Sequence, residues 1–490
     1  MSSNPSTKSQ KLGLTALVAI VVSSMIGSGV DSLPQNMAEK SAVAPVVIAW
    51  LVCGIGMFFI AQTFVRLSTA RPDLQAGIYM YAREGFGELP AFIVGWGYWL
   101  MAIFSNVAFA VMVMDTLNYF MPGKFTGGNN FNSIIGASLL IWGFHALVVS
   151  GSKVAGSLNL IGTVAKLIPL VFFIAAVVYF LDASKLTANV WGHDAGAATP
   201  ALGSGLSQVL SPLFVALWCF IGIEGAVALS GRALNQRDVA RATMLGFIIS
   251  LAICILISIL PFGSMSQQVL SELPNPSTAG VINRLVGEWG EIFINIGVLI
   301  SILSSWLAWT MICAEIPMVA AQNGTFPAWF AKKNAQGAAS NSLWMSSAIM
   351  QAVLLLVYFS NDAWLTLLAI SSIMVLPAYL CSAAFLTKLS INKGNTSNGL
   401  QKLERNNAAL VISILAIFFC LFMLYASDIA YVAMSPLILT LGIPLFIFRK
   451  KQDVSGVFHL SKNEVLGLAA IFCLDAFIIF IYFQGWIKFP

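Results

Sequence analysis

Charged residues are scarce in this chain. Lys, Arg, Asp and Glu make up 9% of its 490 residues, whereas soluble domains carry about 25%. Hydrophobic residues make up 58%, and apolar stretches of about 17 to 25 residues, the length that crosses a bilayer as a helix, recur along the chain. The composition therefore excludes a soluble globular protein and predicts an all-α integral membrane protein embedded in a lipid bilayer.

Histidine is rarer still, and cysteine shows no useful spacing. The three histidines, His145, His193 and His459, are scattered along the chain, and all seven cysteines fall within apolar stretches without the paired spacing of a metal or redox site. No stretch between spans exceeds about 25 residues. We therefore expect no metal and no cofactor. A membrane-embedded enzyme is one alternative function, but it would need a cluster of catalytic residues, and no such cluster is seen in the sequence. A channel or a purely structural protein stays open.

Thirteen apolar segments are long enough to be membrane spans, so we expect about 12 to 13 transmembrane helices. The first 11 residues are polar, and no cleavage site precedes the first break in the apolar run, so we expect the first span to be retained. The segments lie near residues 12–33, 43–67, 90–120, 131–150, 157–181, 207–230, 240–262, 288–320, 343–359, 364–387, 407–426, 429–448 and 464–487.

Lys and Arg alternate in density between the two sides of these spans. With a cytoplasmic N-terminus, 19 of the 25 lie inside, five lie outside, and Lys166 lies within a span. This bias predicts a multi-pass protein of the cell inner membrane with its N-terminus in the cytoplasm. It also accounts for the net charge of +5, so no nucleic-acid partner is expected.

Two apolar spans are interrupted by glycine at corresponding places. Ser23–Gly29 reads Ser-Ser-Met-Ile-Gly-Ser-Gly, and Cys219–Gly225, about 195 residues later, reads Cys-Phe-Ile-Gly-Ile-Glu-Gly. Backbone at membrane depth leaves a helix only where it is buried in protein or lines a cavity. Matched breaks in two halves of a chain indicate a transporter's substrate site. The alternative is a face of small residues that packs two helices together.

The positions of the breaks divide the chain. Spans one to five and six to ten each begin with a broken helix, and an odd number of spans per repeat places the second copy upside down. We predict a cytoplasmic N-terminus (residues 1–11), a transport core built as an inverted 5+5 repeat (12–387) and C-terminal helices (388–490). Residues 75–87 are too short and polar to span, and they form either an amphipathic surface helix or a re-entrant gate.

Two ionisable residues lie deep within spans, where charge is costly and therefore points to function. Glu224, in the second break, is a candidate proton carrier or pH-sensitive gate; the alternative is a permanently protonated carboxyl that bonds backbone N–H groups. Lys166, in the fifth span, can take the place of a coupling sodium ion and tie the first helix to the fifth. Its alternative is an ammonium that snorkels to an interface.

Other residues near the breaks suit an amino acid. The half-helix that follows Ser28 and Gly29 presents free N–H groups to a carboxylate, and the carbonyls of Met25, Trp218 and Ile221 suit an ammonium. Trp218, Trp306 and Trp309 are mid-span aromatic rings that can hold a cationic side chain, and Ser105 and Asn106 can supply polar contacts. Asp31, Asp115, Glu315 and Asp475 are further acids within or near the spans, and which of them, if any, faces a cationic side chain of the substrate stays open; for Asp115 and Asp475 a structural role is favoured.

Several motifs in order along residues 10–390 resemble one known family. Gly27-Ser28-Gly29 followed by Leu33–Ala38, then Gly77–Gly87, Trp218–Gly225, Ser230–Ala233 and Asn323–Pro327, are similar to the basic amino acid/polyamine antiporters of the amino acid–polyamine–organocation (APC) superfamily. The resemblance implies a LeuT-like inverted 5+5 repeat with discontinuous helices 1 and 6. It also implies exchange of one amino acid for another by alternating access without sodium. Leu33–Met37 and Ser230–Ala233 look most like the arginine/ornithine branch.

The resemblance assigns roles to individual residues. Ser28 and Gly29 would bind the substrate carboxylate, and the carbonyls of Met25, Trp218 and Ile221 its amino group. Trp309 matches an aromatic that stacks on a guanidinium, Asn106 matches an asparagine that binds the side chain, and Glu224 matches a proton-sensing glutamate whose hydrogen-bonding neighbour is Tyr98. Lys166 is similar to a lysine found in sodium-independent relatives.

The chain also departs from the arginine/agmatine branch of that family. Met101 and Ala102 stand where small residues are usual near the side chain of the substrate, and Ala378, with Tyr379 beside it, replaces a tyrosine. We predict an antiporter of basic amino acids, arginine against ornithine. The alternative is a proton-coupled permease or antiporter for lysine, histidine or another amino acid, and the sequence leaves a homodimer open.

Overall fold

The computed structural model describes residues 13–74, 78–151, 162, 165–192, 202–228, 233–391, 407–452 and 460–489. All the secondary-structure elements in these described ranges are helices, which confirms the predicted all-α fold. The predicted N-terminal segment 1–11, the start of the fifth predicted span and most of the Ser230–Ala233 motif lie outside the described residues.

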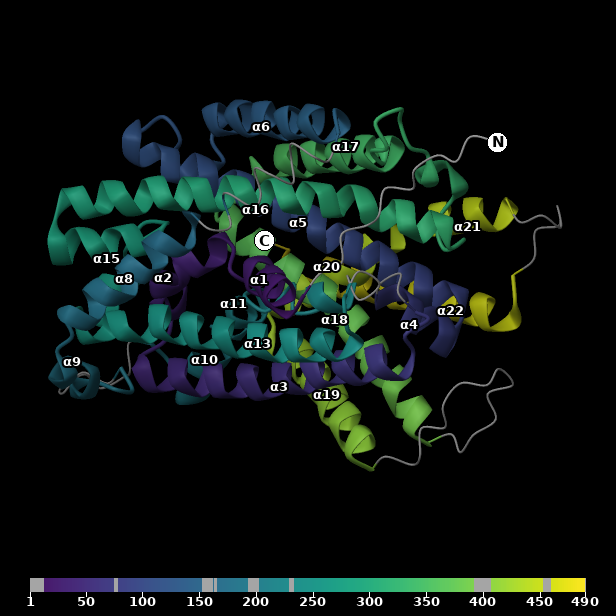
Figure 1. Cartoon of the computed structure of the whole chain (residues 1–490), viewed down its shortest axis with the longest axis horizontal. Helices are drawn as coiled ribbons and strands as arrows, with labels where there is room; N and C mark the ends of the chain where they lie inside the picture. The colour runs from purple at the N-terminus through teal and green to yellow at the C-terminus, as the bar shows by residue number, and fades with distance from the viewer. Residues whose placement is uncertain are drawn as a thin grey trace.

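The first half of the chain is interrupted at its start and then forms long helices (Figure 1). The short helix Ile78–Phe86 directly precedes the long helix Glu88–Phe120. In order, the elements are α1 (Leu14–Met25), η1 (Ser28–Ser32), α2 (Leu33–Ala38), α3 (Val43–Ala70), α4 (Ile78–Phe86), α5 (Glu88–Phe120), η2 (Thr126–Gly128), α6 (Phe131–Val149), α8 (Leu167–Tyr179) and α9 (Ala183–Ala188).

The second half also begins with short helices, continues with long ones, and ends with the three C-terminal predicted spans. Its elements are α10 (Gly205–Leu210), α11 (Leu213–Trp218), α12 (Gly225–Ala228), α13 (Gln236–Ile259), η4 (Leu260–Gly263), α14 (Gln267–Ser271), α15 (Ser277–Val286), α16 (Glu288–Gln322), η5 (Ala328–Ala331), α17 (Ser340–Val357), α18 (Ala363–Ile391), α19 (Asn407–Ala426), α20 (Ile429–Thr440), α21 (Ile443–Lys451) and α22 (Lys462–Phe483).

Ten described helices are long and apolar enough to cross a membrane, and eleven if the bent pair Leu14–Met25 and Gly29–Ala38 counts as one span. Two shorter apolar helices, Leu167–Tyr179 and Gly205–Trp218, correspond to the fifth and sixth predicted spans. The total among the described residues falls below the predicted 12 to 13 because neither of these two helices is described as one long helix. The fifth span begins in residues outside the described ranges, and the sixth is broken after Trp218.

Helix α5 lies at the centre of the bundle. Its most apolar window is 89% buried, whereas the corresponding window of α22 is 17% buried. In Figure 1, α5 runs beside α16, and α1 lies next to α13; the contacts of α5 with α16 and of α1 with α13 agree with this view, and α5 also contacts α18. The two broken helices are therefore enclosed by the long helices of both halves.

A glycine hinge recurs at the same place in both halves. Gly87 joins α4 to α5 with φ 98° and ψ −170°, and Gly287 joins α15 to α16 with φ 92° and ψ −174°. Only glycine adopts such a positive φ readily. Each hinge is followed by a glutamate, Glu88 or Glu288. The two joins share a backbone conformation and lie in corresponding positions of the two predicted repeats.

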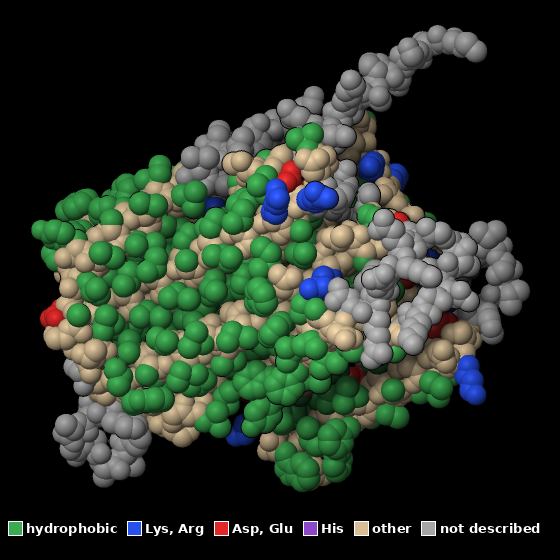
Figure 2. Space-filling view, turned by 60° about the horizontal axis from the view of Figure 1, so that its bottom comes forward, with side chains coloured by type: hydrophobic (Ala, Val, Ile, Leu, Met, Phe, Trp, Pro, Cys, Tyr) green, Lys and Arg blue, Asp and Glu red, His purple; other side chains and the backbone are tan. Residues whose placement is uncertain are grey.

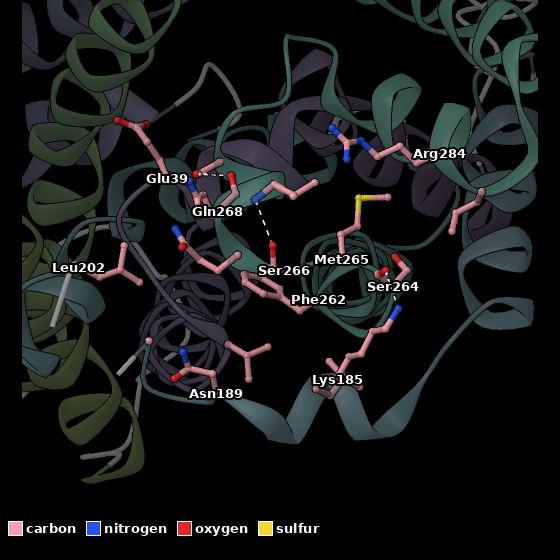
Figure 3. Close-up of a pocket in the computed structure, with 17 residues that line it drawn as sticks. Glu39, Lys185, Asn189, Leu202, Phe262, Ser264, Met265, Ser266, Gln268 and Arg284 are labelled. Carbon is pink, nitrogen blue, oxygen red and sulfur yellow. Dashed lines mark hydrogen bonds between the residues drawn. The ribbon is translucent and has the colours of Figure 1, made fainter. Parts of the chain in front are cut away.

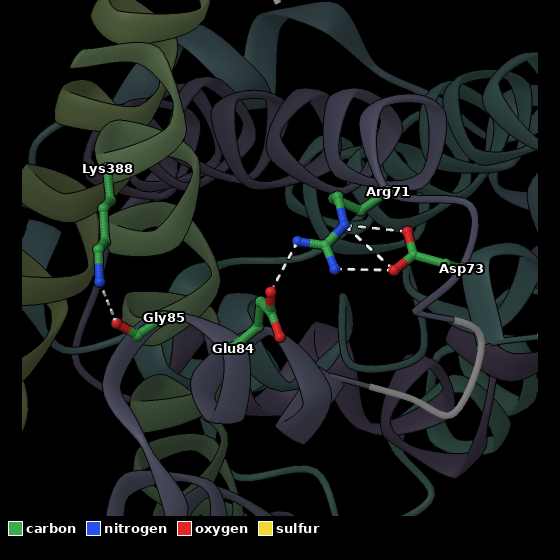
Figure 4. A network of polar contacts seen from close by, with 5 residues as sticks. All are labelled: Arg71, Asp73, Glu84, Gly85 and Lys388. Carbon is green, nitrogen blue, oxygen red and sulfur yellow. Dashed lines mark hydrogen bonds and ion pairs between the residues drawn. The ribbon is translucent and has the colours of Figure 1, made fainter. Parts of the chain in front are cut away.

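Helix α4, which covers most of the segment 75–87, packs against α5 and α18 and is linked by an ion pair to the end of α3 (Figure 4). Arg71, at the end of α3, pairs with Asp73 at 2.7 Å and with Glu84 at 3.1 Å. Lys388 Nζ donates to the carbonyl of Gly85 at 2.7 Å. The Arg71 guanidinium also holds the pKa of Asp73 below its usual value. One face of α4 is buried while Glu84 stays exposed, as in an amphipathic helix.

The C-terminal helices are attached to the core through charged side chains. Lys450, at the end of α21, lies 2.6 Å from Glu88 at the start of α5 and 2.7 Å from Glu464 in the first turn of α22. Arg449 lies 3.0 Å from Glu88. Three helix ends from distant parts of the chain therefore meet at one cluster of ion pairs.

The surface carries the apolar belt expected of a membrane protein. Figure 2 shows hydrophobic side chains over most of the visible face, with Lys and Arg gathered mainly toward one end. Many large apolar side chains are exposed, including Leu139 at 71%, Phe418 at 68% and Phe483 at 80%. Exposure of this extent is costly in water and favourable in lipid.

Candidate functional site

The two helix breaks predicted from the sequence contact each other. Helix α1 ends at Met25 and η1 begins at Ser28, while α11 ends at Trp218 and α12 begins at Gly225. Ser24 Oγ donates a hydrogen bond to the carbonyl of Gly222 at 2.9 Å. The two interruptions, 198 residues apart in the chain, therefore form one site.

Gly222 is required for this contact. Its φ is +106°, and a Cβ built on it would lie 2.9 Å from the backbone of Ser24. Both the backbone conformation and the close approach favour glycine. The glycine that suggested a break in the sequence is thus the point at which one half-helix packs against the other.

Lys166, just before α8, holds the end of α1. Its Nζ donates to the carbonyl of Ser23 at 2.8 Å, to Ser23 Oγ at 2.9 Å and to the carbonyl of Ile26 at 2.8 Å. All three N–H groups of the ammonium therefore have acceptors, and the side chain is only 2% exposed. The link between the first break and the fifth span, which the sequence predicted, is present; the predicted replacement of sodium stays a prediction.

Glu224 is held from two sides by phenols. Tyr98, on α5, donates to its Oε1, and Tyr379, on α18, donates to its Oε2 at 3.1 Å. The Glu224 side chain is buried. The second break is therefore tied to two long helices through one carboxylate, so a change in the charge of Glu224 would act on both.

Tyr379 was not assigned this contact from the sequence. In the sequence Tyr379 stands beside Ala378, which occupies the place where a tyrosine is usual. A phenol one position away from an expected phenol, in a span facing a buried acid, is the signal that could have identified it. Its hydroxyl reaches Glu224 across 155 residues of sequence.

The ring of Trp218 covers the first break. A Cβ built on Gly29 would lie 1.9 Å from Cζ3 of Trp218, so the ring rests directly on this glycine. Phe109 and Trp364 each pack edge-to-face against the indole of Trp218, with ring centroids 6.1 and 5.7 Å from that of Trp218. Phe109 and Trp364 were not predicted, because one aromatic among the many in the apolar spans carries no distinguishing pattern.

Asn106 lies between α5 and α16 with both ends of its amide engaged. Its Nδ2 donates to the carbonyl of Ala102 at 2.7 Å and to Cys313 Sγ at 3.3 Å, and its Oδ1 accepts from Thr310 Oγ1 at 3.2 Å. The side chain is fully buried. Both N–H groups of the amide already have acceptors, so Asn106 would have to exchange one of them to donate to a substrate, whereas its Oδ1 has a second lone pair.

The remaining predicted residues are also buried. Met101 and Trp309 lie on α5 and α16, and Met25 and Ile221 lie at the two breaks. The carbonyl of Met25 accepts from Gly27 N at 3.1 Å, and the carbonyl of Trp218 accepts from Ile221 N at 3.1 Å. A carbonyl has two lone pairs, so both can still accept a bond from an ammonium.

Ser28 is described in its backbone only. It opens η1, whose first N–H groups, like those of any helix, have no partner within the helix. The side chain of Ser28 lies outside the described residues. The acids expected to be structural do have structural partners: Asp115 Oδ1 accepts from Gly127 N at 3.1 Å, and Asp475 Oδ2 accepts from Thr440 Oγ1 at 2.6 Å.

Comparison with known proteins agrees with this architecture. The model of the amino acid permease family matches residues 12–436, which include both breaks and the helices around them. The match begins in the first predicted span and ends within α20.

Three similar proteins are each named arginine/agmatine antiporter. The protein of Chlamydia pneumoniae is 49% identical over 98% of this chain and 99% of its own length. That of Chlamydia felis is 49% identical over the same shares, and that of Chlamydia caviae is 50% identical over 97% of each chain. The chain therefore belongs to the amino acid permease family, within the APC superfamily, as the ordered motifs in its sequence indicated.

Proposed function

We propose that this protein is a sodium-independent antiporter of cationic amino acids that exchanges external arginine for internal agmatine by alternating access. The observation that carries the proposal is the direct contact between the two broken helices, where Ser24 Oγ bonds to the carbonyl of Gly222 at 2.9 Å. A site made of two interrupted helices offers N–H groups to a carboxylate and carbonyls to an ammonium, which are the shared parts of every amino acid.

The substrate backbone is bound at the breaks. The N–H groups that begin η1, at Ser28 and Gly29, receive the carboxylate, supported by the positive end of the helix dipole. The carbonyls of Met25, Trp218 and Ile221 receive the amino group. The Trp218 ring, which rests on Gly29, has to move for a carboxylate to reach these N–H groups.

The substrate side chain is directed toward α5 and α16. Trp309 offers its ring face to a guanidinium, and Asn106 offers one end of its amide in exchange for an internal contact. Met101, buried on α5, shapes the same region. This placement is supported by the position of the three residues on the two helices that enclose the breaks.

Two ionisable residues control the cycle. Glu224 couples it to pH, because protonation removes the charge to which Tyr98 and Tyr379 donate. Lys166 supplies a fixed positive charge to the carbonyls of Ser23 and Ile26. Such carbonyls are the oxygen ligands that a sodium ion would use, so the ammonium removes the need for that ion.

The counter-substrate is proposed from the names of the relatives. Arginine/agmatine antiporters are about half identical to this chain over nearly its whole length. The sequence prediction of ornithine, based on Leu33–Met37 and Ser230–Ala233, is the competing possibility. Agmatine and ornithine both carry the cationic end, but only ornithine has the carboxylate that the first break would bind.

The test is uptake of labelled arginine into proteoliposomes loaded with a single internal compound. Agmatine, ornithine, lysine and a neutral amino acid are compared at equal concentration in sodium-free buffer. The proposal expects internal agmatine to give the fastest uptake. Fastest uptake with internal ornithine would replace agmatine as the counter-substrate, and equal uptake with all four would refute selectivity for cations.

We also propose the orientation that the basic residues indicate, with the N-terminus in the cytoplasm and the protein in the cell inner membrane. The concentration of Lys and Arg toward one end of the surface supports it (Figure 2). Reaction of a single cysteine introduced at exposed Lys332 with an impermeant reagent, in intact cells and in opened ones, tests it. Labelling in intact cells would contradict the proposed orientation.

A further inference from the structure

A cavity separate from the breaks lies beside the two half-helices that lead into them. We call it the Asn36 pocket, and its walls include Asn36, Glu39, Phe214, Asp428 and Tyr431. They come from α2 and its C-terminal end, α11, the turn between α19 and α20, and α20. The volume is about 450 Å³, within the range of about 300–1,000 Å³ found for small-molecule sites.

Asn36 is an unsatisfied amide in the wall of this pocket. Its side chain is 5% exposed, and neither Nδ2 nor Oδ1 has a hydrogen-bond partner among the residues that the structure describes. Buried side-chain amides are nearly always paired. Asn36 borders a cavity, and neither the donor nor the acceptor of its amide has a partner in the described protein. This indicates that a molecule bound in the cavity is the partner of both.

The charges of the pocket favour a cation. Glu39 and Asp428 contribute two carboxylates, and Asp428 uses Oδ1 to accept from Ala430 N at 2.8 Å. Lys40 also lines the pocket and lies 3.9 Å from Glu39, so the lining carries one basic side chain against two carboxylates. Because the Lys40 side chain is 70% exposed, it neutralises Glu39 weakly. Burial raises the pKa of Glu39, Lys40 lowers it, and the nearby carboxylate of Asp362 raises it again. A bound cation would offset both the cost of burying the Glu39 carboxylate and its repulsion from Asp362.

A larger neighbouring cavity has the opposite character. Its volume is about 1040 Å³, and Glu39 lies in its wall as well, but Lys185 and Arg284 face it from the other side (Figure 3). Two basic side chains repel a cationic ligand. Of the two cavities that share Glu39, the Asn36 pocket is therefore the one suited to a cation.

We propose that the Asn36 pocket is a second binding site for the cationic substrate, in addition to the site at the breaks. The ammonium or guanidinium N–H groups donate to Asn36 Oδ1 and to the carboxylates of Glu39 and Asp428, while Asn36 Nδ2 donates to the carboxylate of the ligand. This rests on the proposed function for the identity of the ligand as a cationic amino acid. In the proposed orientation the pocket lies on the outer side, where arginine enters.

The test counts the arginine molecules bound per purified full-length protein by equilibrium dialysis with labelled arginine. The parent protein is expected to bind two, with different affinities. Asp428→Asn should weaken the outer binding event by about two- to fivefold, the effect of one exposed ion pair. Asp182→Asn is the matched control, because Asp182 is also an exposed helix cap, accepting from Ser184 N at 3.0 Å, and does not line the Asn36 pocket.

Asn36→Leu, of similar size and without polar atoms, should abolish the outer event and leave exchange with internal agmatine intact. Saturation of the parent at one arginine, or two events that neither Asp428→Asn nor Asn36→Leu changes, would overturn the proposal and assign water to Asn36. If Asn36→Leu does not fold, Asp428→Asn alone decides. Failure of the proposed function is distinguishable, since the parent would then show no exchange of arginine in proteoliposomes.

Discussion

Replacing Lys166 by methionine tests how the first break is held open. Methionine fills a similar volume and donates no hydrogen bond. The change removes three bonds from the ammonium, at 2.8, 2.9 and 2.8 Å. The Ser23 hydroxyl can rotate to another partner, but the carbonyls of Ser23 and Ile26 lose a charged donor inside the protein.

The size of the effect follows from those two carbonyls. A buried polar group left without its partner costs about 1–3 kcal/mol, which gives about 2–6 kcal/mol for the pair. Methionine spares the cost of burying an ammonium, which offsets part of this loss. We expect a net destabilisation of about 2–4 kcal/mol, seen as a lower midpoint of thermal unfolding in detergent. Lys332→Met, at an exposed lysine, is the control and should leave the midpoint unchanged.

Sodium extends this test. Lys166→Ala leaves room for an ion beside the same carbonyls, whereas Lys166→Met does not. Ligands that bind only the folded state raise its stability, so sodium should raise the midpoint of Lys166→Ala and not that of the parent or of Lys166→Met. An unchanged midpoint in Lys166→Met would refute the energetic role of the ammonium, and an equal sodium response in all three proteins would refute its role as a substitute for the ion.

Three further changes have defined outcomes. Glu224→Gln should keep arginine binding but flatten the pH dependence of exchange, because the amide cannot change its charge; a pH profile equal to that of the parent would remove Glu224 from the coupling. Trp309→Leu should weaken arginine binding by about 1–2 kcal/mol, roughly 5- to 30-fold, in a calorimetric titration, and a loss of neutral-substrate binding to the same extent would point to packing instead. Gly222→Ala should abolish exchange, since its Cβ would lie 2.9 Å from Ser24 in a backbone with φ +106°. Gly143→Ala is the control, because a Cβ there meets no atom within 4 Å.

The long helices were predictable because lipid imposes a simple rule on them. A run of apolar residues has to satisfy its backbone internally, so composition alone placed the span near 131–150, which the structure gives as Phe131–Val149. The break at Gly222 was predictable for the same reason, since glycine and polar residues within such a run need a local explanation.

The arrangement around the breaks was less accessible from sequence. Tyr379 and Trp364 act across long sequence separations, and their neighbours carry no periodic signal that singles them out. The matched breaks and the odd number of spans in each half predicted an inverted repeat, whereas the common φ and ψ of the joins at Gly87 and Gly287 appear only in the structure. That the amide of Asn36 has no hydrogen-bond partner in the described protein is likewise a property of the folded structure, which the sequence does not show.

The central claim is obligatory exchange at a site formed by the two breaks. It is tested most directly by uptake of labelled arginine into sodium-free proteoliposomes, either loaded with unlabelled arginine or agmatine or left empty. Obligatory exchange predicts rapid uptake into loaded vesicles and none into empty ones. Equal uptake into empty vesicles that collapses with the proton gradient would contradict it and establish a proton-coupled permease.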